Sequence, residues 1–68
     1  MMTMIQAQAA VNALRGAFPM VEFQATRGSG IGLYESFPSI VVSRRGVEMV
    51  ASEPFEAGEH ARKLGAVT

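Results

Sequence analysis

The stretch FPSIVVSRRGVEMVAS, residues Phe37–Ser52, decides the fold because it predicts two β-strands that fold back on each other around an arginine and glycine turn. Two registers are open. A two-residue loop at Arg45-Gly46 separates the side chains into two faces, whereas a three-residue loop over 44–46 would place Gly46 in a left-handed bulge and shift one strand relative to the other. We favour the two-residue register because it segregates the aliphatic side chains better.

In that register both faces of the hairpin carry aliphatic side chains. One face holds Ile40, Val42, Val47, Met49 and Ala51, and the other holds Val41, Ser43, Glu48 and Val50. We expect the first face to form the core. The second face has no evident cover, so it is our candidate surface for binding a protein.

A helix and a strand are predicted before the hairpin. Thr3 and Gln6 have the spacing of a capping box, and Gly16 and Pro19 are typical stop signals, so the expected helix covers residues 4–15. Its apolar stripe consists of Met4, Ala7, Val11, Leu14 and Phe18. Residues 20–27 alternate between apolar and polar side chains, as a half-buried strand does, and we also expect Met20 and Met49 in the core.

The remaining segments complete the expected fold. The glycine-rich residues 28–32 form a connection, and residues 33–37 are either a short strand or an irregular return leg. Pro54 and the acids beside it start a helix over 54–64, with Ala57, Ala61 and Leu64 on its apolar side. We therefore predict an α+β domain of order α-β-β-β-α, in which both helices pack on one face of a three-stranded antiparallel sheet.

Size and composition restrict the class of protein. The 68 residues predict one small domain over 1–68, and a domain of this size gains stability from association. Six basic residues balance six acidic ones, so net charge supports neither a nucleic acid nor a membrane as partner, and cysteine is absent. No membrane span or signal peptide is recognisable, and we expect a cytoplasmic protein without cofactor or metal.

No catalytic set is recognisable, so we do not expect an enzyme. His60 is the one general-base candidate by its pKa range, but its helical neighbours are typical of a solvated face. The glycines of residues 28–32 do not lead into a helix, as a phosphate-binding loop requires.

A basic group offers an alternative function. Arg44 and Arg45 at the hairpin turn, together with Arg27, could contact the phosphates of a nucleic acid. The helix, three strands and helix within about 65 residues resemble the double-stranded-RNA-binding domain, and this resemblance implies RNA binding. In that family lysines cluster at the start of the last helix, whereas this chain has Glu53, Pro54, Phe55 and Glu56, whose acids would repel phosphate.

The function expected from the sequence is therefore binding of a protein without catalysis. The partner is another protein or a second copy of the chain. Small cysteine-free domains of balanced charge are typical of accessory proteins of phages and mobile elements, which often block a host protein. Binding of nucleic acid through Arg27, Arg44 and Arg45 is the alternative.

Overall fold

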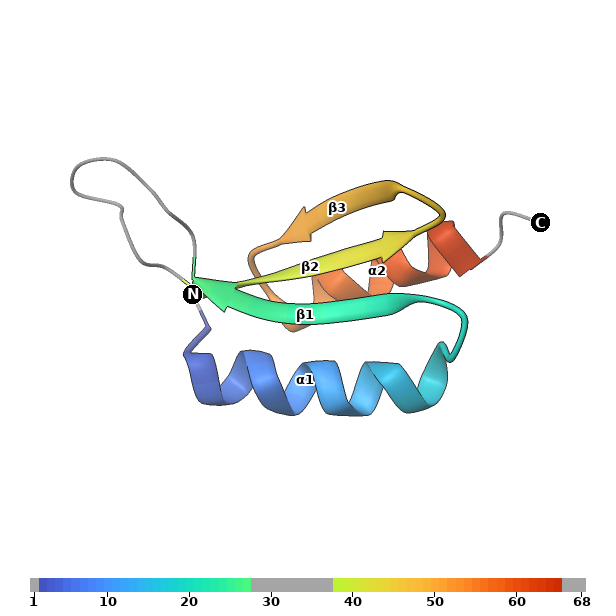
Figure 1. Cartoon of the computed structure of the whole chain (residues 1–68). Coiled ribbons are helices and arrows are strands. Elements are labelled where there is room, and N and C mark those ends of the chain that lie inside the picture. Colours follow the sequence, from blue (N-terminus) through green and yellow to red (C-terminus); the bar gives the residue numbers. More distant parts are fainter. Residues whose placement is uncertain (1, 28–37, 66–68) are drawn as a thin grey trace.

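The computed structural model describes residues 2–27 and 38–65, which fold in the order α-β-β-β-α (Figure 1). The elements are α1 (Met4–Ala17), β1 (Glu22–Arg27), β2 (Pro38–Arg44), β3 (Val47–Ala51) and α2 (Pro54–Gly65). The predicted α+β class and element order are confirmed. The glycine-rich connection and the undecided segment 33–37 lie outside the described residues.

The three strands form an antiparallel sheet in the order β1-β2-β3. Ile40 pairs with Ala51 and Arg44 pairs with Val47, so the loop of the hairpin contains only Arg45 and Gly46. Both loop residues have positive φ, 54° and 82°, which is the requirement of a type I′ turn. The two-residue register is confirmed, although an arginine occupies a position that asparagine or glycine fills more readily.

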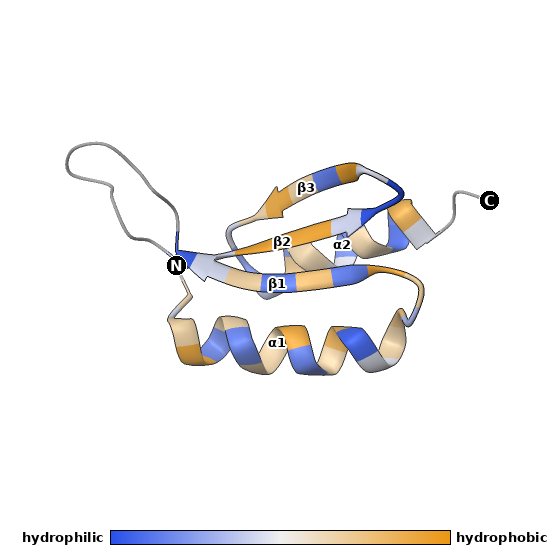
Figure 2. Ribbon diagram, in the orientation of Figure 1, coloured by the Kyte–Doolittle hydropathy of each residue, from blue (hydrophilic) through white to orange (hydrophobic). Residues whose placement is uncertain are grey.

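The core lies between one face of the sheet and the two helices. The sheet contributes Phe23, Ile40, Val42 and Ala51, while the helices contribute Ala7, Val11, Ala57, Ala61 and Leu64. Figure 2 shows apolar residues along the middle of β2 and hydrophilic positions alternating along β1. Several of the helical core residues are alanines, which let α2 approach the sheet closely.

The predicted start of α1 is confirmed and its predicted end is wrong. The capping box is present: Gln6 N–H donates to Thr3 Oγ1 at 3.1 Å, and Thr3 N–H donates to Gln6 Oε1 at 2.9 Å. The stop at Gly16 was wrong, because the helix continues to Ala17. Its end is fixed at Phe18, whose N–H donates to the carbonyl of Leu14 and whose φ of −130° is not helical.

Two further core predictions are corrected by the exposed fractions of the side chains. Met20 is 69% exposed because it lies in the turn between α1 and β1, before the strand begins at Glu22. Val47 is on the core side by register but is 53% exposed, since it stands beside the hairpin turn. Met49 packs against the core as expected.

Candidate functional site

The face of the sheet opposite the helices carries three rows of side chains that cross the strands. The row nearest the hairpin turn is Glu22, Ser43 and Glu48; the middle row is Gln24, Val41 and Val50; the third row is Thr26 and Ser39. We call these eight residues the open face. Acids, aliphatic groups and hydroxyls thus follow one another along the strands.

The open face contains all four residues predicted to bind a protein. Val50 is 62% exposed and Glu48 is exposed, while Val41 and Ser43 are half-buried by their neighbours on β1 and β3. Together with Arg15 and residues of β1, three of them line a shallow polar hollow at the acidic end of the face. The structure therefore brings Val41, Ser43, Glu48 and Val50 together on one surface.

Each outer edge of the sheet receives a side chain from a helix. In a two-residue hairpin the pair next to the loop, here Arg44 and Val47, is hydrogen-bonded, and hydrogen-bonded and non-hydrogen-bonded pairs then alternate along the strands. Val50 belongs to a non-hydrogen-bonded pair, so its N–H and C=O point away from β2. The same alternation makes the N–H and C=O of Phe23 on β1 point away from β2. Arg15 Nη2 donates to the outward carbonyl of Phe23 at 3.2 Å, and His60 Nε2 donates to that of Val50 at 3.3 Å.

These two contacts interrupt the edges at which another strand could pair. An added strand needs a row of free acceptors and donors, and on each edge one outward carbonyl of that row, that of Phe23 on β1 or Val50 on β3, already accepts a hydrogen bond. Just before β1, the N–H of Val21 donates to the carbonyl oxygen of Phe18 at 3.1 Å. Each edge of the sheet is therefore partly occupied by a side chain from a helix.

The three arginines of the nucleic-acid hypothesis do not form one group. Arg27 pairs with Pro38 at the opposite end of the sheet from the hairpin turn. Arg44 Nη1 donates to the carbonyl oxygens of Leu64 at 2.8 Å and Gly65 at 3.3 Å, so this side chain caps the C-terminus of α2. Arg45 is exposed in the turn.

His60 was the one general-base candidate of the sequence, but its ring contacts the backbone of Val50 and its neighbours Glu56 and Ser52 bind each other. Glu56 Oε1 accepts from the N–H of Ser52 at 2.8 Å and from its hydroxyl at 3.3 Å. The backbone bond lowers the pKa of Glu56 most; desolvation partly opposes it, while the bond from the Ser52 hydroxyl and the electrostatic interaction with His60 lower the pKa further. In a nucleophilic triad the histidine would bind the serine, whereas here the serine binds the glutamate and the histidine binds a backbone carbonyl.

The other ring nitrogen of His60, Nδ1, is buried and has no hydrogen-bond partner among the described residues. Within residues 2–27 and 38–65, His, Asp and Glu side chains form no group of three that could hold a metal ion.

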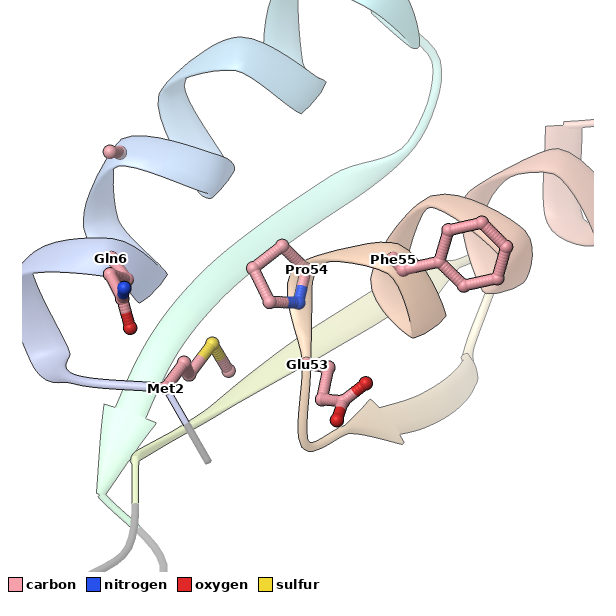
Figure 3. A pocket seen from close by; sticks show the side chains of 6 residues that line it. Met2, Gln6, Glu53, Pro54 and Phe55 are labelled. Atoms are coloured by element: carbon pink, nitrogen blue, oxygen red, sulfur yellow. The ribbon is translucent and has the colours of Figure 1, made fainter.

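A second surface was missed by the sequence analysis. Near the N-terminal ends of the two helices, a mostly apolar cleft of about 460 Å³ is lined by Met2, Gln6, Ala9, Glu53, Pro54 and Phe55 (Figure 3). Met2 is only 4% exposed, whereas Phe55 is 75% exposed. The helices approach each other further along, where a Cβ on Gly58 would lie 3.9 Å from Leu14 Cδ2.

A signal for Phe55 was present in the sequence. It lies outside the stripe of Ala57, Ala61 and Leu64, so the helical periodicity already placed this large aromatic away from the core. No comparable signal pointed to Arg15 or to the capping role of Arg44. Those contacts depend on how the helices lie against the sheet.

Comparison with protein-family models, with curated proteins and with solved structures finds no match for this chain. In the part of the chain that the structure describes, neither helix combines the length and hydropathy needed to cross a membrane.

Proposed function

We propose that this chain is a protein-binding module that uses the open face, without catalysis, as its docking surface. The observation that carries the proposal is the arrangement of the sheet: both helices cover one face, and the other leaves Val50 62% exposed beside Val41. Exposed aliphatic groups flanked by polar ones are typical of a surface that meets a partner.

The side chains that occupy part of each sheet edge support this use of the face. Addition of a strand is the common alternative by which a small sheet binds a peptide. Arg15 and His60 oppose that mode here because each occupies an outward carbonyl of an edge strand.

The size and charge balance suit a module that blocks another protein. With 68 residues and no net charge, the domain has no electrostatic preference for a nucleic acid and gains stability when a partner covers apolar surface. Inhibition of a host protein by an accessory protein of a phage or mobile element is the role that we propose for the module.

The experiment is affinity capture from a cell lysate with mass spectrometry, using the wild type and Val50→Lys. Val47→Lys is a matched control, since Val47 is on the same strand and 53% exposed but belongs to the other face. We expect Val50→Lys to lose partners that both the wild type and Val47→Lys retain. Capture of the same proteins by all three would contradict the proposal, provided that circular dichroism shows each variant folded.

A further inference from the structure

We infer that the open face also binds a second copy of this chain, so that the module is a face-to-face dimer when no other partner is present. This inference rests on the proposed function because it names a partner for the same face. The order of the three rows makes the face complementary to itself in one orientation and not in another.

Two symmetric ways of stacking the sheets keep β2 above the partner's β2. If the two-fold axis runs along the strands, the row of Glu22 and Glu48 meets the same row of the second copy. Each Glu22 then faces a Glu48, and apposed carboxylates repel each other. This orientation is disfavoured by charge.

If the axis instead runs across the strands, the rows are reversed end for end. The acidic row then meets the hydroxyl row, so that Glu22 faces Thr26 and Ser43 faces Ser39 of the other copy. Hydroxyls can donate hydrogen bonds to carboxylates, and such charge-assisted bonds are favourable. Reversing the rows therefore separates the acidic rows and gives Glu22 a hydroxyl partner, while Glu48 on β3 faces no residue of the third row.

The middle row lies on the axis in this second orientation and meets itself. Val41 packs on Val41 and Val50 on Val50, while the two Gln24 amides can donate to each other. The contact thus has the usual anatomy of an interface, with aliphatic groups at the centre and polar pairs on both sides.

The contact is small, and this limits its strength. Three strands and three rows amount to on the order of 300 Å² of flat sheet from each copy. Standard interfaces bury about 800 Å² per partner, so we expect a weak dimer that dissociates readily on dilution. A dimer of this strength can give way to a tighter partner on the same face.

The first test is sedimentation equilibrium of the full chain from 10 µM to 1 mM. We expect the average mass to rise above 7.3 kDa with concentration for the wild type and Val47→Lys, and to stay at 7.3 kDa for Val50→Lys. A wild-type mass that stays at 7.3 kDa at 1 mM overturns the inference. So does a Val50→Lys variant that associates as strongly as the wild type.

The second test determines the orientation and uses the absence of cysteine from the chain. Val50→Cys places a thiol on the proposed axis, so a short bismaleimide should link two copies at 0.5 mM several-fold faster than it links Val47→Cys. In the rejected orientation Val50 faces Gln24, and the fast product would come from a mixture of Val50→Cys with Gln24→Cys. Fast linking of that mixture, or equal rates for Val50→Cys and Val47→Cys, overturns the inference.

The two proposals fail on different results. A chain that is monomeric at 1 mM but loses a captured protein on Val50→Lys would overturn the dimer and leave the docking surface intact. A dimer that forms as expected while capture is unaffected by Val50→Lys would remove the docking of another protein and retain the dimer.

Discussion

Replacing Arg44 by methionine should destabilise the domain by about 2 kcal/mol. Arg44 Nη1 donates to two carbonyls at the C-terminus of α2, at 2.8 and 3.3 Å. Hydrogen bonds from a charged donor contribute about 1.5–3 kcal/mol, and a cation at a helix C-terminus adds about 0.3–1 kcal/mol. We take the lower part of this range because the bond to Gly65 is exposed.

This loss is a large share of the total stability, which for 68 residues is roughly 3–10 kcal/mol. Thermal unfolding followed by circular dichroism at pH 7 should show a Tm lower by about 8–16 °C. Methionine is chosen over alanine because it keeps the apolar stem, which lines a small apolar hollow with Val47 and Leu64. The measured difference then reports the lost hydrogen bonds and charge.

Arg45→Met is the matched control, since it removes the neighbouring arginine, which is exposed in the turn. We expect its Tm to stay within about 2 °C of the wild type, because surface substitutions usually change stability by less than about 0.5 kcal/mol. Equal Tm values for Arg44→Met and Arg45→Met would refute the capping role of Arg44.

Three further outcomes follow from the structure. Arg45→Asn should raise the Tm by a few degrees, since asparagine followed by glycine suits the positive φ of 54° at this position, and an unchanged or lower Tm in a melting curve would contradict this. Ile40→Ala should cost about 2–5 kcal/mol in urea unfolding because Ile40 is fully buried, whereas Phe55→Ala should cost less than about 0.5 kcal/mol because Phe55 is 75% exposed; similar midpoints for both would be inconsistent with the packing. The bond from Ser52 lowers the pKa of Glu56 below 4.5, so its stabilisation is present above pH 4.5 and is lost as the pH falls through the lowered pKa. The Tm difference between the wild type and Glu56→Gln should accordingly shrink from pH 7 to pH 3, and a constant difference would speak against the role of the carboxylate.

Local chemistry explains why much of the fold could be predicted. The capping box depends only on residues three positions apart, and Thr3 and Gln6 form it with both expected bonds. The hairpin register follows from the segregation of aliphatic side chains, which outweighs the unfavourable arginine at position 45. The face holding Val41 and Val50 could be predicted for the same reason.

The errors occur where contacts distant in the sequence decide the outcome. Glycine costs a helix only about 1 kcal/mol, and the packing of Leu14 and Phe18 against the core favours carrying α1 past Gly16. The role of Arg44 depends on the end of a helix 20 positions away, which no local pattern encodes. Arg27 could not be separated from the turn until the pairing of β1 with β2 was known.

The contacts of Arg15 and His60 on the outward carbonyls also restrict the kind of assembly that the domain can form. Association through the edges of a sheet can repeat, since each added strand offers a new edge, and it leads to ribbons and fibrils. Association through one face stops at two layers here, because the helices cover the opposite face. If the domain associates through the open face as proposed, these two contacts favour finite complexes over open-ended polymers.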